Sequence, residues 1–318
     1  MDGEEMMINS THFSYFILSA YLDSGLLKYL HFLVVMCLYI VIIVSNVLLI
    51  VVICVNRSLH EPMYFFLLFV NELFGSAGLF PFLLVQILKD IHTISISLCF
   101  LQVYIFFSYI NVQICILAAV SYDRYLAICF PLQCHTHMTC RKAAVLIALT
   151  WVYRFVEAGV MVSLSAPLQL CGNIIPKVYC DNYSIVKLAC SDTTVNNIYG
   201  IVYTVIVIIG ILSVFLYTYM KILKVCFSGS KETRQKAIST CTPHLASLLN
   251  FTIGGSFEIF QSRFNMSSLP SVLRIFLSLY WITCQPLFNP LIYGLNLTKI
   301  RDSYRRWGGD SKSRGTSP

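Results

Sequence analysis

The sequence predicts an all-α membrane protein in which a bundle of seven helices spans the bilayer. The first observation is composition: hydrophobic residues make up 57% of the 318 residues and charged residues only 12%, whereas a soluble domain carries about 25% charged residues. The second is that the apolar residues form seven long stretches. Each reaches the roughly 20 residues that a helix needs to cross a hydrocarbon core about 30 Å thick. Little of the chain remains for a separate soluble domain.

The seven predicted spans follow one another along almost the whole chain. The seventh is the least apolar, because Gln285, Asn289 and two prolines lie in its second half. Proline is tolerated in a spanning helix where neighbouring helices provide partners for the freed backbone groups. In chain order the spans are expected near 29–55, 62–88, 97–123, 142–164, 196–223, 237–261 and 271–295.

Lysine and arginine orient the bundle. If the N-terminus lies outside, 15 of the 22 basic residues fall on the inner segments, as the positive-inside rule requires. The net charge of +7 is then mostly a cytoplasmic rim, which argues against nucleic acid as a partner. The inner segments lie near 56–61, 124–142, 221–236 and 299–318.

The chain ends are assigned to the two sides of the membrane. Residues 1–28 have neither a basic n-region nor a short apolar core, so they are expected to be an extracellular tail and not a cleaved signal peptide. Asn9, in an Asn-Ser-Thr sequon, is the expected glycosylation site. The seven-helix domain covers 29–295, and 296–318 is expected to be cytoplasmic. Its basic stretch at 298–307 suits a short amphipathic helix lying on membrane lipid.

Four cysteines lie on the oxidising side of this topology: Cys99, Cys171, Cys180 and Cys190. Four cysteines allow three pairings, and the sequence alone does not choose among them. Metal ligation is the rival interpretation, but the spacing is irregular and the loop holds no histidine. No metal site or cofactor is expected.

A charged motif ends the third span, where Asp123, Arg124 and Tyr125 stand together. An ionisable group at this depth is costly, and a guanidinium keeps its charge, so Arg124 needs a partner. Asp123 supplies one locally. Two interpretations stand side by side: a fixed interfacial ion pair, or a switch that releases Arg124 to a cytoplasmic partner.

A polar motif ends the seventh span. Pro290 removes a backbone hydrogen bond and kinks the helix, while Asn289 and Tyr293 share one helical face. Polar side chains in lipid turn to the bundle interior, so Asn46 and Glu72 are candidates for the same inner cluster. The pattern predicts a hinge with exchangeable polar contacts.

These two motifs, on the third and seventh of seven spans, resemble those of rhodopsin-like (class A) G-protein-coupled receptors. Cys99 lies 25 residues before Arg124, and Trp151 fits the tryptophan of the fourth helix. Four longer stretches resemble the olfactory receptor family, in wording closer to fish-type than to mammalian members. They are 59–67 (LHEPMYFFL), 121–132 (SYDRYLAICFPL), 187–192 (KLACSD) and 236–245 (KAISTCTPHL).

The resemblance implies roles for several residues. It implies the disulfides Cys99–Cys180 and Cys171–Cys190. It also implies that Tyr219 and Tyr293 approach Arg124 in the active state.

Three positions depart from the family pattern. Glu72 lies two residues too close to Pro62 for the family's acidic position, which leaves its register and its role as a sodium or proton site open. Thr252 replaces the usual bulky aromatic of the sixth helix. Ser45 precedes Asn46 where the family has glycine.

The resemblance also implies a ligand pocket between the third, fifth, sixth and seventh helices, under the outer loop. Its wall is mostly apolar with a few polar groups, which suits a small ligand with one polar handle. Phe106 stands where amine receptors carry an aspartate, which disfavours a biogenic amine. The pocket positions are Phe106, Phe107, Ile110, Asn111, Tyr203, Val207, Gly255, Ser256, Ile259, Leu279 and Ile282.

Charged residues near these helices have two interpretations. Arg154 and Glu157 stand three residues apart in the fourth span, and mutual pairing is the simplest expectation. Glu258, with Arg263 beyond it, is either a reader of polar odorants or a solvated rim charge.

The resulting functional hypothesis is an odorant receptor of the plasma membrane. A small molecule binds from outside and activates a stimulatory, olfactory-type heterotrimeric G protein, which raises cyclic AMP. The alternatives are a non-olfactory class A receptor for another small-molecule or lipid ligand and, less favoured, a transporter, for which inverted repeats are missing. No nucleophile–base set indicates an enzyme.

Overall fold

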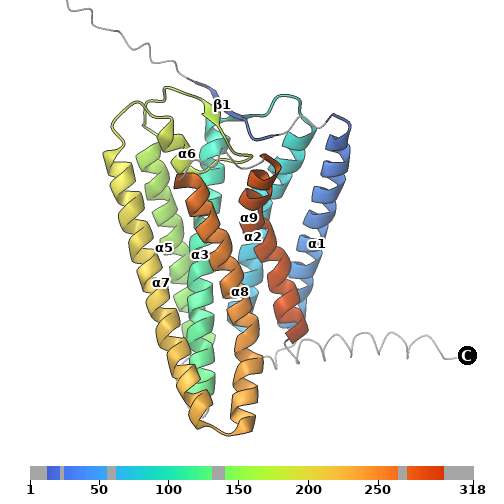
Figure 1. The fold of residues 1–318 in the computed structure, drawn as a ribbon, viewed down its shortest axis with the longest axis vertical. Helices are drawn as coiled ribbons and strands as arrows, with labels where there is room; N and C mark the ends of the chain where they lie inside the picture. The colour runs from blue at the N-terminus through green and yellow to red at the C-terminus, as the bar shows by residue number, and fades with distance from the viewer. Residues whose placement is uncertain (1–12, 22–24, 56–61, 131–139, 264–270, 297–318) are drawn as a thin grey trace, which may run out of the picture.

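The computed structural model describes residues 13–21, 25–55, 62–130, 140–263 and 271–296, and within these ranges the chain forms a bundle of long helices (Figure 1). Each long helix coincides with one predicted span and differs from it by a few residues at the ends. The predicted helix after residue 296, most of the N-terminal tail and Asn9 lie outside the described residues. The long helices are α1 (Leu27–Val55), α2 (Pro62–Leu88), α3 (Ile96–Cys129), α5 (Cys140–Ser165), α7 (Thr194–Ser228), α8 (Lys231–Arg263) and α9 (Ser271–Asn296).

Length and apolar composition alone identify four of these helices as membrane spans: α1, most of α2, α3 and α7, judged on the described residues. The other three carry more polar residues. α8 begins with charged residues, and α9 buries Gln285 and Asn289. A helix whose polar side chains face partners inside the bundle needs fewer apolar residues to span lipid.

α3 lies at the centre of the bundle, where it packs against α2, α5, α7 and α8. Accordingly it buries an unusual set of polar side chains: Gln102, Ser108, Asn111, Gln113, Ser121 and Arg124. α1 and α7 lie at the edges and expose mostly large apolar side chains. In water such surfaces would drive association, and in a bilayer they face the acyl chains.

The outer face carries a small sheet that the all-α prediction did not include. Its three strands are β1 (Tyr15–Leu18), β2 (Thr93–Ser95) and β3 (Ile174–Ile175), in the order β2-β1-β3. β1 pairs antiparallel with β2 and parallel with β3. Phe16 and Leu18 are fully buried under it, so this part of the predicted tail belongs to the fold.

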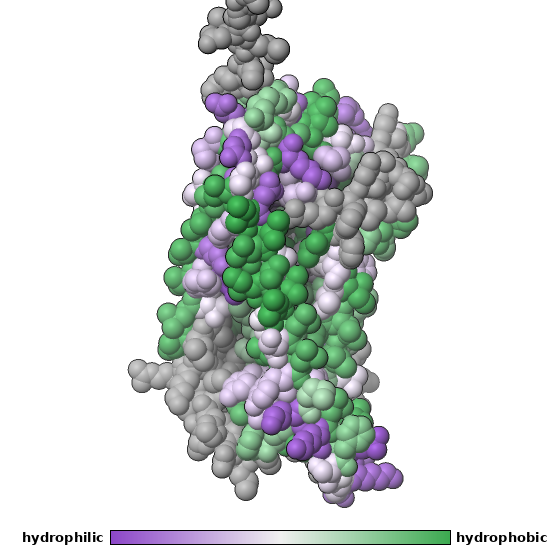
Figure 2. Space-filling model, turned by 60° about the vertical axis from the view of Figure 1, so that its left-hand side comes forward, coloured by the Kyte–Doolittle hydropathy of each residue, from purple (hydrophilic) through white to green (hydrophobic). Residues whose placement is uncertain are grey.

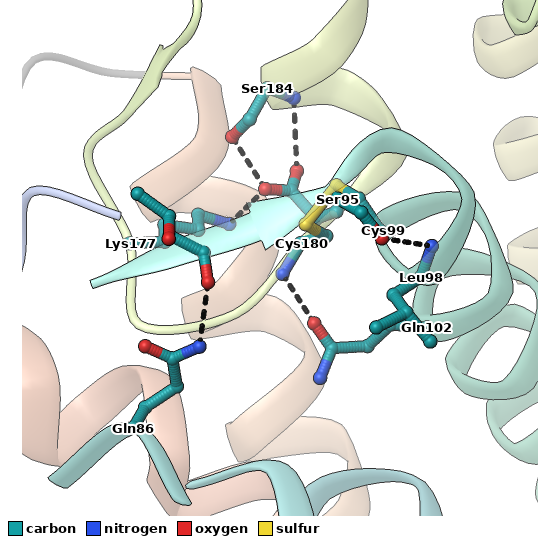
Figure 3. The surroundings of a disulfide bond; sticks show 10 residues. Gln86, Ser95, Leu98, Cys99, Gln102, Lys177, Cys180 and Ser184 are labelled. Carbon is teal, nitrogen blue, oxygen red and sulfur yellow. Dashed lines mark hydrogen bonds and ion pairs between the residues drawn. A yellow bond between two sulfur atoms is a disulfide. The ribbon is translucent and has the colours of Figure 1, made fainter. Parts of the chain in front are cut away.

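The outer loop between α5 and α7 is tied down at two points. Cys99 at the start of α3 forms a disulfide with Cys180, and Cys171 forms one with Cys190. These are the two pairings that the family resemblance implies. Figure 3 shows the first, beside which the Cys180 backbone N–H donates to Gln102 Oε1 at 2.8 Å. Between the disulfides lies the short helix α6 (Asn182–Lys187).

Candidate ligand pocket and activation switch

A buried carboxylate joins three helices in the middle of the bundle. Glu72 of α2 is inaccessible to solvent. Tyr109 Oη donates to Glu72 Oε2 at 2.8 Å, and Gln113 Nε2 donates to Oε1 at 2.8 Å. Asn289 Nδ2 of α9 donates to the same Oε1 at 2.5 Å. Glu72 therefore occupies the inner polar cluster despite its short spacing from Pro62, and its immediate partners are hydrogen-bond donors from α3 and α9.

Asn46 of α1 satisfies a carbonyl group that Pro290 leaves unpaired in α9. Because Pro290 has no N–H, the carbonyl of Pro286, four residues earlier, loses its normal helical donor. Asn46 Nδ2 donates to that carbonyl oxygen at 2.9 Å, and to the Ile42 carbonyl at 2.8 Å. A polar side chain from a neighbouring helix thus replaces the missing bond.

The cytoplasmic half of α8 is held by hydrogen bonds to both α3 and α9. Ser247 Oγ donates to Asn289 Oδ1 at 2.6 Å. His244 Nε2 lies 2.7 Å from Ser121 Oγ of α3, and its Nδ1 lies 3.2 Å from Tyr293 Oη of α9. These bonds link α8 to the two helices that carry the predicted switch motifs.

His244 and Ser247 were not predicted as switch residues. His244 belongs to the stretch 236–245 that carries the family resemblance, and Ser247 follows it. His244 and Ser247 lie three residues apart and so share one face of α8. Asn289 and Tyr293 lie four residues apart and share one face of α9 in the same way. These two matching spacings are the signal in the sequence that indicates a polar contact between the helices.

At the cytoplasmic end of α3, Arg124 Nη2 lies 2.8 Å from Asp123 Oδ2, and both side chains are largely buried. Tyr125 and Tyr219 belong to the adjacent apolar cluster. The Tyr219 ring stacks on His244 at 6.3 Å. In this structure Arg124 is held by its neighbour in sequence, and the two tyrosines expected to approach it are engaged with other groups.

Six of the predicted pocket residues form two groups under the outer loop. In the first, Phe106 of α3 and Leu279 and Ile282 of α9 pack with the loop residues Val178 and Tyr179. The ring centroids of Phe106 and Tyr179 are 5.3 Å apart. This group forms an apolar contact between α9 and the loop.

The second group surrounds Tyr203 of α7. Tyr203 Oη donates to Asn111 Oδ1, and the Phe107 ring lies 5.2 Å from the Tyr203 ring. Phe107 and Tyr203 line a cavity of about 210 Å³ that α6 and Met161 help to enclose. Val207 lies one turn deeper on α7 and lines a different hollow.

The other predicted pocket positions are placed less favourably. Ile110 packs deeper, against Leu117 and Phe251. A Cβ on Gly255 would stand 3.2 Å from the Trp281 ring, so this position packs directly against α9. Ser256 and Ile259 are exposed. Both lie with Leu245 and Leu249 on the face of α8 that points out of the bundle. The prediction that they line the pocket is therefore wrong, because the neighbouring positions of α8 face inward instead.

Two charged groups have the partners that explain their burial. Arg154 Nη1 lies 2.6 Å from Glu157 Oε2, the pairing expected from the sequence. Glu258 is neither solvated nor free, because Lys177 Nζ of the outer loop lies 2.5 Å from its Oε1. Lys177 also lies 3.2 Å from Asp181. Burial alone would lower the pKa of Lys177, but the two carboxylates outweigh it and raise that pKa.

The comparisons with known proteins all agree on one family. A family model described as olfactory receptor matches residues 35–307. Olfactory receptor 11A1 of Homo sapiens is 35% identical over 296 residues, which cover 92% of each chain. Olfactory receptor 6N1 of Homo sapiens is 34% identical, covering 86% of this chain and 88% of its own. Olfactory receptor 8U3 of Mus musculus is 32% identical, covering 94% of each.

Proposed function

This chain belongs to the olfactory receptor family, and on that premise we propose that it couples odorant binding to a stimulatory, olfactory-type G protein and so raises cyclic AMP. It is a multi-pass receptor of the plasma membrane that binds odorants and signals through a G protein, and it is not an enzyme. The G-protein type, the pocket residues and the switch residues belong to the proposal.

The proposed odorant pocket lies beneath the outer loop, between α3, α7, α8 and α9. Its walls are aromatic and aliphatic, and Asn111 and Tyr203 offer hydrogen bonds, which suits a small apolar molecule with one polar group. Its residues are Phe106, Phe107, Ile110, Asn111, Tyr203, Val207, Gly255, Leu279 and Ile282.

The hydrogen bonds of α8 carry the proposed switch. An odorant shifts the receptor towards a state in which the cytoplasmic end of α8 moves away from α3, and it does so only by binding that state more tightly. The movement breaks the contacts of His244 and Ser247. Tyr219 and Tyr293 then approach Arg124. Arg124 separates from Asp123 and engages the G protein. Asn289 and Pro290 act as the hinge. Glu72, at the hub, is kept as a candidate sodium or proton site.

The test is cyclic AMP in cells that express the chain with the olfactory-type stimulatory G protein, exposed to a panel of small odorants. We expect a dose-dependent rise that Arg124→Ala abolishes while surface expression is kept. Retained odorant-evoked cyclic AMP in Arg124→Ala would contradict the switch. A wild-type receptor that reaches the cell surface but raises no cyclic AMP with any odorant of the panel would contradict stimulatory coupling.

Further parts of the proposal concern lineage and the chain ends. The fish-type assignment is supported by the wording of the four motif stretches, and a phylogenetic tree of fish and mammalian receptors tests it. We place an extracellular tail at 1–28, glycosylated at Asn9, the receptor domain at 29–295, and a lipid-bound helix and tail at 296–318. A shift in electrophoretic mobility lost in Asn9→Gln tests the glycan.

A further inference from the structure

A second hollow lies on the lipid-facing side of the bundle, away from the outer loop. It measures about 590 Å³ and lies between α3, α5 and α7. α3 packs closely against both other helices, whereas α5 and α7 meet each other only sparsely. The volume falls in the range of about 300–1,000 Å³ that is typical of small-molecule sites.

The rim of this hollow is apolar and faces outward. Val156 and Val160 of α5 and Val202 and Ile206 of α7 are all between 45% and 64% exposed. Figure 2, which brings the α7 side forward, shows hydrophobic surface over the middle of the molecule and polar surface mainly near its two ends. The hollow therefore lies beside the acyl chains, and an occupant can enter from the bilayer.

The base of the hollow is polar, which acyl chains alone do not require. Arg154 and Glu157 line it as an ion pair. Arg154 Nη1 also donates to Tyr203 Oη at 3.2 Å, and Nη2 donates to Cys115 Sγ at 3.3 Å. Arg154 Nε is buried and has no acceptor among the described residues. A buried donor without an acceptor costs free energy, so a ligand that supplies one is favoured.

We propose that the α3–α5–α7 hollow is a membrane-facing binding site for neutral aliphatic molecules that carry one carbonyl oxygen, such as ketones and esters. Glu157 balances the charge of Arg154, which favours a neutral acceptor over a carboxylate. The carbonyl accepts from the Arg154 guanidinium, and the chain lies along the valine and isoleucine rim. The site opens to the bilayer, and it meets the proposed odorant pocket at Tyr203 and Val207.

Two glycines provide a matched test. A Cβ on Gly210, which lines the hollow, meets no atom within 4 Å, and the same holds for Gly159 of α5, which does not line it. Gly210→Leu therefore adds a side chain at the hollow with open space around its Cβ, and Gly159→Leu makes the same substitution elsewhere. Leucine is also the better helix former, so neither variant is expected to misfold.

The experiment uses the purified full chain in lipid nanodiscs and an aliphatic methyl ketone with a diazirine in its chain. Its readout is direct labelling mapped to residues, so it does not depend on G-protein coupling. We expect saturable labelling of the α5 and α7 rim, competed by the unlabelled ketone and reduced about tenfold or more in Gly210→Leu but not in Gly159→Leu. Equal labelling of the two variants, or labelling that the ketone does not compete, would overturn the proposal and indicate acyl chains as the occupant.

A second comparison tests the polar base. A diazirine alkane of equal length lacks the carbonyl, so the wild type should prefer the ketone about tenfold, the value of one hydrogen bond to a charged group. The double variant Arg154→Met with Glu157→Gln removes both charges together and should abolish that preference while keeping alkane labelling. A preference that survives in the double variant would overturn the role of Arg154.

Discussion

Asn46 shows how a single side chain makes a proline tolerable inside a membrane. Its amide donates to the Pro286 carbonyl that Pro290 leaves without a helical donor. Because the hydrocarbon core holds no water, a carbonyl that loses its helical donor finds no water molecule to donate to it instead. A side chain of α1 thus satisfies a backbone group of α9.

We expect Asn46→Leu to destabilise the purified receptor by about 1–2 kcal/mol, because the Pro286 carbonyl loses its donor. Thermal unfolding in detergent measures this change. Ser45→Ala is the control, since within the described ranges the Ser45 hydroxyl bonds to the Ile42 carbonyl of its own helix. Equal melting temperatures for the two variants would contradict the role of Asn46.

Ser247 provides a residue-scale test of the switch. Ser247→Ala removes the 2.6 Å bond to Asn289 with almost no change of shape. We expect ligand-independent cyclic AMP to rise about threefold, the effect of about 0.6 kcal/mol, which is typical of one hydrogen bond between membrane helices. Thr252→Ala removes a hydroxyl that, in the part of the chain the structure describes, bonds to the Leu248 carbonyl of its own helix, and it should leave basal activity unchanged. Unchanged basal activity in Ser247→Ala would show that this bond does not hold the inactive state.

At the scale of elements, the two disulfides contribute unequally. They close segments of 81 and 19 residues, which in the chain-entropy model correspond to about 4.5 and about 3 kcal/mol. Cys99–Cys180 also joins the outer loop to α3, whereas Cys171–Cys190 links two parts of one loop.

We therefore expect Cys99→Ser to block surface delivery and Cys171→Ser to reduce it less. Antibody staining of an N-terminal tag on intact cells measures delivery. Cys180→Ser should behave like Cys99→Ser, because it breaks the same bond. Wild-type surface levels for Cys99→Ser would contradict this assignment.

The outer loop is also fastened to α8 by Lys177. Removing one partner from a buried ion pair costs about 3 kcal/mol, so Lys177→Met should lower the thermal stability strongly. Lys187→Met, on the exposed face of α6, should change it little. The pKa of Lys177 is raised in the folded protein. Its contribution to stability is therefore fully present at pH values below the pKa of an ordinary lysine, and it is lost only as the pH rises through the higher pKa of the folded state. The difference between wild type and Lys177→Met should therefore stay constant from about pH 6 to pH 9, and a fall within that window would argue against the ion pair.

At the scale of the whole molecule, the proposed switch makes the odorant pocket and the cytoplasmic face communicate through α8 and α9. Such coupling between two binding equilibria is reciprocal. Bound G protein should therefore tighten odorant binding by the factor by which odorant tightens G-protein binding. Binding isotherms in nanodiscs, with and without G protein, measure both factors. Arg124→Ala should reduce both factors to one, and two unequal factors in the wild type would contradict a single shared switch.

The sequence predicted well whatever depends on long apolar runs and local charge. The spans, the Arg154–Glu157 pair and the family motifs are patterns within one segment, and membrane thickness and positive-inside bias act on segments. It predicted poorly which face of a helix turns inward. Ser256 and Ile259 were misplaced because α8 has polar and apolar residues all round, so no periodicity marks its inner side.

By itself the sequence determined the class of this protein, its membrane topology and the residue types available at each depth, because those follow from the solvent that each segment must meet. Only the tertiary structure decided which polar groups are partners. Asn46 with Pro286, Glu72 with Asn289, and Lys177 with Glu258 lie 81 to 240 residues apart. In a low-dielectric interior each buried polar group needs a partner, but which one it finds depends on how the helices are packed.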